Sequence, residues 1–133
     1  MHLIVYTTLA VFALVTGMAG TTTVKAQADD IALRQAGQRH FIRCVACHSV
    51  SAAAPAKTGP HLQDIVGRRV ASVPGFRYTT ALKDQSFVWT KDRLENLLRQ
   101  PQKQAPGLCL PFTGLTRRKD RTDLVAYLAR PVP

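Results

Sequence analysis

The chain has 133 residues, 46% of them hydrophobic and 20% charged, which is enough for one compact domain and too few for two. Its 18 Lys and Arg residues outnumber its 8 Asp and Glu residues, and the net charge of +10 excludes an acidic disordered tail protein and an acidic carrier. The three cysteines are too few for a disulfide framework, so each one needs an explanation of its own.

The N-terminal segment has the composition of a targeting sequence. From Leu3 to Ala19 the chain is mostly apolar and carries no charged residue, and Ala26-Gln27-Ala28 forms a small-x-small cleavage site. We therefore predict a signal peptide over residues 1–28 and one domain over residues 29–133, exported to the periplasm. Because no Lys or Arg precedes the apolar run, an uncleaved membrane anchor stays open as the alternative.

Three segments have the spacing of apolar residues that is typical of helices. The first is expected over residues 30–43, where Asp29-Asp30 can cap the N-terminus. The second is expected over residues 91–100, with Thr90 as its N-cap, and the third over residues 120–129.

The remaining segments are expected to be largely irregular. Residues 61–66 could form one or two helical turns that end at Gly67. Residues 68–83 are expected to be an ordered loop with a short helical turn, and residues 101–115 a loop rich in Pro and Gly. Since no segment alternates like a strand, we predict an all-α domain of short helices and long loops.

The chemistry of the chain lies in Cys44-Val45-Ala46-Cys47-His48. This C-x-x-C-H pattern is the attachment signature of c-type haem. Thiols three positions apart on a helical turn can reach the two vinyl groups of one porphyrin edge, and the adjacent imidazole can bind the iron. A zinc site would need a second Cys/His pair, which this chain lacks. A thioredoxin-like redox pair would need a strand before the helix, which the sequence does not predict. We therefore predict one covalently attached haem c that also supplies apolar core to a short chain.

Further motifs resemble those of the class I cytochromes c of the mitochondrial and bacterial c2 type, over essentially all of residues 29–133. They are Phe41–His48, Thr58–Leu62, Gly67-Arg68, Pro74–Tyr78 and Asp123–Leu128. The resemblance implies that the carbonyl of Pro60 accepts a hydrogen bond from His48, and that Gly37 and Phe41 pack the first helix against the last. It also places Arg68, Tyr78 and Trp89 at the haem propionates, and Leu62, Leu94, Leu98 and Phe112 in the haem pocket.

One position departs from the family pattern. Where the resemblance places the axial methionine, in a segment resembling Pro-Gly-Thr-Lys-Met-x-Phe-x-Gly, this chain has Leu110. The tyrosine that supports that methionine corresponds to Leu97. The only methionines are Met1 and Met18, within the predicted signal peptide. Ligation of the iron by His and Met is therefore excluded if the signal is cleaved.

Three candidates for the sixth iron ligand remain. We favour the thiolate of Cys109, because it is one residue from the ligand position and thiolates bind iron strongly. The second candidate is an open or water-bound position walled by Leu108 and Leu110. The third is a distant group such as His40, a Lys or a new N-terminus, whereas His61 is expected on the proximal side.

These observations predict a periplasmic electron carrier with low-potential His48/Cys109 ligation, and not an enzyme, because no catalytic constellation is recognisable. The alternative is a haem sensor, a small-ligand binder or a weak peroxidase with an open sixth position. The resemblance implies acidic redox partners that dock on basic residues, here Lys57, Lys103 and Arg117-Arg118-Lys119. We expect a monomer that binds no nucleic acid, since no DNA-binding motif is present, and that contacts a membrane only if the N-terminal segment is uncleaved.

Overall fold

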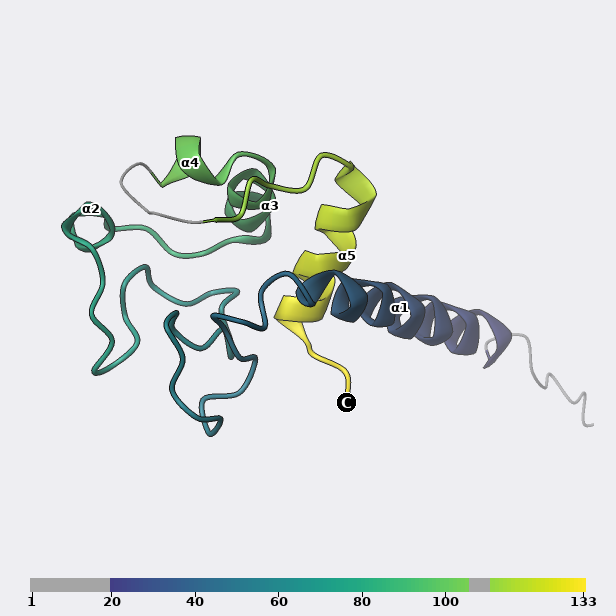
Figure 1. Cartoon of the computed structure of the whole chain (residues 1–133). Coiled ribbons are helices and arrows are strands. Elements are labelled where there is room, and N and C mark those ends of the chain that lie inside the picture. The colour runs from purple at the N-terminus through teal and green to yellow at the C-terminus, as the bar shows by residue number, and fades with distance from the viewer. Residues whose placement is uncertain (1–19, 106–110) are drawn as a thin grey trace, which may run out of the picture.

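The computed structural model describes residues 20–105 and 111–133. Over these residues the backbone forms helices joined by long loops, and its only strand-like pairing is one isolated bridge between Arg69 and Val88. The all-α architecture predicted from the sequence is therefore confirmed (Figure 1). The helices are α1 (Gly20–Phe41), α2 (Thr80–Lys83), α3 (Lys91–Arg99), α4 (Pro101–Gln104) and α5 (Arg118–Ala129). Within the described part of the chain, no helix is long and apolar enough to cross a membrane.

Helix α1 begins earlier than the sequence predicts, at Gly20, and ends two residues earlier, at Phe41. The predicted cap at Asp29-Asp30 is wrong, because both residues lie inside the helix. Each pairs with a basic residue one turn away: Lys25 Nζ lies 3.1 Å from Asp29 Oδ2, and Arg34 Nε lies 3.0 Å from Asp30 Oδ2. Pairs at this spacing stabilise a helix, so α1 runs through Ala26–Ala28. Cleavage after Ala28 stays a prediction.

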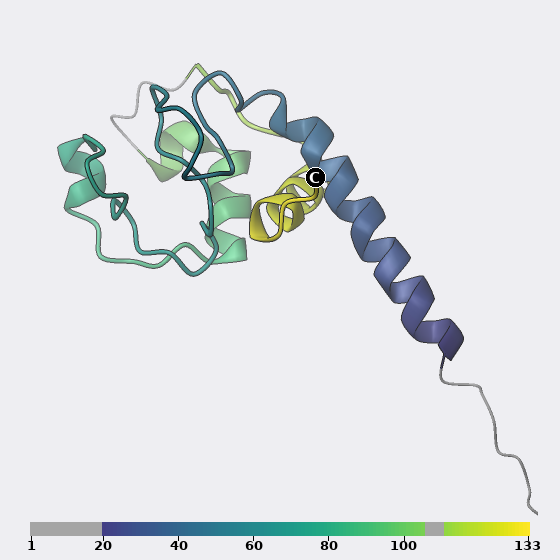
Figure 2. The same cartoon turned by 90° about the horizontal axis from the view of Figure 1, so that it is seen from below.

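Helices α1 and α5 cross at close range (Figures 1 and 2). A Cβ atom on Gly37 would lie 2.0 Å from the carbonyl oxygen of Asp123 and 2.6 Å from the Cβ of Tyr127. One turn further on, the rings of Phe41 and Tyr127 pack with their centroids 5.6 Å apart. The predicted packing of the first helix against the last is thus confirmed, and it depends on the missing side chain of Gly37.

Helix α3 agrees with its prediction to within one residue. The Oγ1 atom of Thr90 caps it by accepting a hydrogen bond from the backbone N–H of Arg93, at 3.2 Å. Leu94 and Leu98, four residues apart, share a buried face that packs into the same core as α5. Cys44 and Val45 of the Cys-x-x-Cys-His motif, and Val50 and Leu62 after it, pack against this core.

Residues 61–66 form isolated turns rather than a helix. The N–H of Ile65 donates to the carbonyl of Leu62 at 3.2 Å, and the N–H of Arg68 donates to the carbonyl of Ile65 at 3.1 Å. The backbone N–H of Leu62 donates instead to the carbonyl of Ser49, at 2.6 Å, and the N–H of Gly67 donates to the carbonyl of Trp89, at 2.8 Å. The N–H of Gly67, which a continuing helix would bond to residue 63, is thereby bonded to a distant segment. This is a tertiary effect that local sequence spacing does not contain.

Two short helices interrupt the predicted loops. Helix α2 is the short turn expected within residues 68–83. Helix α4, by contrast, occupies residues for which only loop was predicted. It begins at Pro101, a residue suited to the first helical position because its fixed φ is helical and its missing N–H would have no partner there.

Candidate functional site

The motif follows α1 as a series of tight hydrogen-bonded turns. The N–H of Cys44 donates to the carbonyl of Phe41 at 2.7 Å, and the N–H of His48 donates to the carbonyl of Cys44 at 2.8 Å. These bonds keep Cys44 and Cys47 about one turn apart. Both cysteines are free and half-buried, and burial raises the pKa of the Cys44 thiol, against the opposing effect of nearby Arg43. The pair thus offers two unpaired thiols on one turn, which is what thioether attachment requires.

The imidazole of His48 is held in one orientation by the loop that follows the motif. Its Nδ1 atom lies 2.7 Å from the carbonyl oxygen of Pro60. A carbonyl oxygen can only accept, so Nδ1 carries the hydrogen and Nε2 is left with a lone pair for a metal. Burial lowers the pKa of His48, with the bond to Pro60 opposing that change and the charge of Lys57 adding to it. A lowered pKa favours the neutral ring, which is the form that binds iron.

Residues 57–62, here called the proximal segment, run alongside the motif. The N–H of Gly59 donates to the carbonyl of Cys47 at 2.8 Å. A Cβ atom on Gly59 would lie 2.4 Å from Cε1 of the His48 ring, so only glycine allows this approach. The contact of Gly59 with His48 was not predicted from the sequence, although Gly59 belongs to the Thr58–Leu62 motif.

The polar residues predicted to bind the propionates are placed as follows. The guanidinium of Arg68 donates to the carbonyls of Gln63 at 2.7 Å and His61 at 2.9 Å. It thereby stabilises the backbone at the end of the proximal segment. The hydroxyl of Tyr78 accepts a hydrogen bond from the N–H of Val73 at 3.3 Å. Their role toward propionates, like that of Trp89, stays a prediction.

The apolar residues predicted to line the pocket gather in one cluster. Leu94 and Leu98 are buried in the core, with 5% and 8% of their surface exposed. Cys44 packs against the same core. The other two predicted pocket residues, Leu62 and Phe112, are partly buried against it, as is Trp89, which was predicted at the propionates. Segments far apart in the sequence are thus brought to one apolar surface beside the motif.

The remaining ligand candidates are only partly within the described residues. Cys109 and Leu110, like Leu108, lie outside them. The Nε2 atom of His40 lies 3.5 Å from Asp120 on α5, and the Nδ1 atom of His61 lies 3.4 Å from Arg68. Over the part of the chain that the structure describes, no group of three or more His, Cys, Asp and Glu side chains could hold a bare metal ion.

The donor set fits a haem better than a protein-bound ion. One neutral imidazole nitrogen, two unpaired thiols and an adjoining apolar wall match the needs of a porphyrin that brings four nitrogens of its own. A helical chain with this arrangement is a c-type cytochrome.

Comparison with known proteins identifies the family, although no family model matches the chain. The chain is 44% identical over 86 residues to cytochrome c type-1 of Ascaris suum, which covers 65% of this chain and 76% of that protein. It is 43% identical over 86 residues to cytochrome c of Gibberella zeae, covering 65% of this chain and 81% of that protein. The chain therefore belongs to the cytochrome c family, is an electron carrier rather than an enzyme, and has covalently bound haem c as its cofactor.

A bacterial relative matches over a somewhat longer stretch. The chain is 39% identical over 95 residues to the cytochrome c-type cyt cy of Rhodobacter capsulatus. The match covers 71% of this chain and 47% of that protein, so the chain spans about half the length of this relative. Both bacterial and eukaryotic proteins are thus among its relatives.

Proposed function

We propose that the chain is an exported one-electron carrier in which Cys44 and Cys47 form thioethers to haem c and His48 binds the iron through Nε2. The observation that carries this proposal is the 2.7 Å bond between His48 Nδ1 and the carbonyl of Pro60, which leaves Nε2 as the metal-binding nitrogen. When bound, haem c supplies a one-electron iron couple. The protein supplies a fixed axial ligand and an apolar wall.

On the distal side we propose the thiolate of Cys109 as the sixth ligand. The support is the sequence: Leu110 stands where the family has its methionine, and Cys109 is next to it. A thiolate donates more charge than a thioether and favours ferric iron, so the midpoint potential is expected to lie below that of His/Met relatives. The rival is an open sixth position, which would suit a sensor, a small-ligand binder or a weak peroxidase.

The change Cys109→Ala separates the two distal proposals. Wild-type ferric protein is expected to give a low-spin thiolate spectrum in electron paramagnetic resonance, and the variant is expected to lose it. Leu108→Ala, a change at the residue before Cys109 in the sequence, serves as the control and should leave the signal in place. Identical ferric spectra for wild type and Cys109→Ala would contradict thiolate ligation, and a high-spin wild-type spectrum would favour the open position.

We also propose that the carrier works in the periplasm. The support is the apolar run from Leu3 to Ala19 followed by the Ala26-Gln27-Ala28 site, together with the attachment of c-type haem outside the cytoplasm. Contact with a membrane follows only from an uncleaved N-terminal segment.

As partners we propose acidic redox proteins. The structure divides the predicted basic residues into two sets. Arg117 pairs with Asp120, and Lys119 pairs with Asp123. Lys103 and Arg118 are exposed, and among the described residues neither forms an ion pair. These two side chains are therefore the better candidates for docking.

Charge reversal tests the docking proposal. Lys103→Glu and Arg118→Glu are each expected to slow association with the redox partner more than they change dissociation. The wild-type rate should also fall steeply with salt, since the Debye length shrinks from about 10 Å at 0.1 M to about 3 Å at 1 M. Lys91→Glu, a change of equal charge on α3, is the control. If the rate of electron transfer changes neither with salt concentration nor with these charge reversals, the proposal of acidic partners is wrong.

A further inference from the structure

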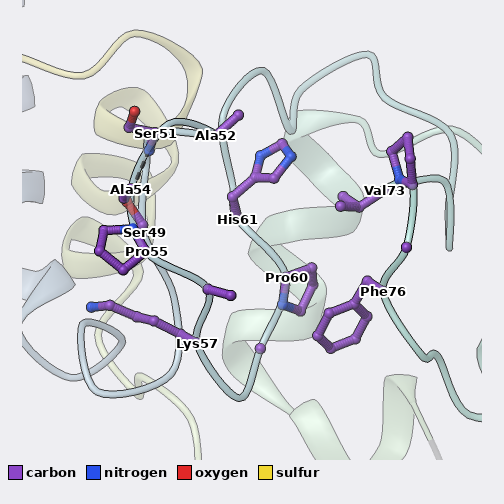
Figure 3. A pocket seen from close by; sticks show the side chains of 14 residues that line it. Ser49, Ser51, Ala52, Ala54, Pro55, Lys57, Pro60, His61, Val73 and Phe76 are labelled. Carbon is purple, nitrogen blue, oxygen red and sulfur yellow. Dashed lines mark hydrogen bonds between the residues drawn. The ribbon is translucent and has the colours of Figure 1, made fainter.

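Lys57 lies in the proximal segment, but its ammonium group is used within the molecule. Nζ donates a hydrogen bond to the carbonyl of Val45 and another, at 3.2 Å, to the carbonyl of His48. Figure 3 shows the side chain extending away from His61 and Phe76, which lie on the other side of the cavity that these residues line. Lys57 is exposed, as most surface lysines are, but its ammonium group is hydrogen-bonded to the haem-attachment motif.

The two acceptors explain why a cation is stabilised here. The last carbonyls of a helical turn have no partners within it, and the partial negative charge at that end favours a positive side chain. Lys57 bonds to two such carbonyls, one on each side of Cys47. Gly59 bonds to the carbonyl of Cys47 itself at 2.8 Å. Three carbonyls of the motif, those of Val45, Cys47 and His48, are therefore held by one short segment, which also holds the His48 ring through Pro60.

We propose that Lys57 is a positioning residue for electron transfer: it fixes the backbone around His48 and places a positive charge beside this ring. The proposal rests on the proposed role of His48 as the proximal iron ligand. Within the described part of the chain, both hydrogen bonds of Lys57 are to the backbone of the Cys44–His48 motif, so its ammonium group acts inside the molecule and not only as part of the basic surface.

The charge has a predictable effect on the iron couple. Ferric haem carries one more positive charge than ferrous haem, so a nearby cation disfavours the oxidised form and raises the midpoint potential. The part of this effect that is Coulombic weakens as salt rises, because the ammonium group is exposed. The part that comes from fixing the carbonyls of Val45 and His48 does not depend on salt in this way.

The test compares three variants of the full haem-loaded chain. Lys57→Met keeps the aliphatic stem but removes the charge and the donors, and we expect a lower midpoint potential and shifted paramagnetic NMR resonances of the His48 ring. Lys57→Arg keeps charge and donors and is expected to restore both readouts. Lys91→Met removes an exposed charge from the start of α3 and is the matched control, with the wild-type potential and resonances expected.

The outcomes separate this inference from the function on which it rests. Haem that extracts from the wild-type protein into acidic organic solvent would overturn the thioether attachment itself. If the haem is covalently held but Lys57→Met matches Lys91→Met in potential and in His48 resonances, the positioning role is wrong. The same holds if Lys57→Met only slows association with an acidic partner. Should Lys57→Met fail to mature, Lys57→Gln, which keeps a neutral donor, is measured by the same criteria.

Discussion

Replacing Gly37 with alanine is expected to lower the free energy of unfolding by about 3 kcal/mol. The added methyl group would lie 2.0 Å from the carbonyl oxygen of Asp123 and 2.6 Å from the Cβ of Tyr127. Neither atom can move alone, since one belongs to the backbone of α5 and the other begins a buried side chain. The crossing of α1 and α5 would therefore have to widen, which also weakens the contact between the rings of Phe41 and Tyr127.

Helix propensity makes the opposite prediction, which sharpens the experiment. In a helix without tertiary contacts, Gly→Ala stabilises by about 1 kcal/mol. Urea unfolding of the holoprotein, followed by circular dichroism, measures the sign directly. Gln35→Ala, an exposed change on the same helix, is the control and should stay within about 0.5 kcal/mol of wild type. A Gly37→Ala protein as stable as wild type would mean that the two helices do not meet as closely as the structure has them.

Helix positions were predictable where the signal is local. Thr90 and the Leu94–Leu98 spacing predicted α3 almost to the residue, because a side-chain cap and an apolar face are both properties of neighbouring residues. The start of α1 was missed because Asp29-Asp30 resembles a cap. In the structure those carboxylates instead pair with Lys25 and Arg34 inside a longer helix.

In the candidate site, too, only the features that depend on neighbouring residues could be predicted. The residues proposed as haem ligands could be singled out from the sequence, because the Cys44–His48 motif is contiguous and its chemistry follows from spacing alone. The bond of Pro60 to His48 was expected only from resemblance. The close approach of Gly59 and the bonds of Lys57 were not predicted, since both depend on the proximal segment lying against the motif. No local pattern in the sequence contains that placement.

Replacing Leu110 with methionine is expected to raise the midpoint potential by a substantial part of the roughly 0.8 V range that axial ligands span. The resemblance places residue 110 at the position of the family's axial methionine, so the change would supply a neutral thioether in place of the proposed Cys109 thiolate. A thioether donates less charge to ferric iron, and the reduced form is favoured accordingly. The measurement is a redox titration of the holoprotein, followed by its optical spectrum.

The design must remove competition between the two sulfur ligands. In Leu110→Met the Cys109 thiolate is still present, so the double change Leu110→Met with Cys109→Ala is expected to reach the highest potential of the series. Leu108→Met places the same side chain two residues earlier and is the control, with the wild-type potential expected. If the double variant keeps a low potential, residue 110 does not face the iron, and the resemblance fails on the distal side of the haem. A low potential in Leu110→Met alone, with a high one in the double variant, would instead contradict the replacement of the thiolate in the single variant and would mean that the Cys109 thiolate outcompetes the thioether for ferric iron.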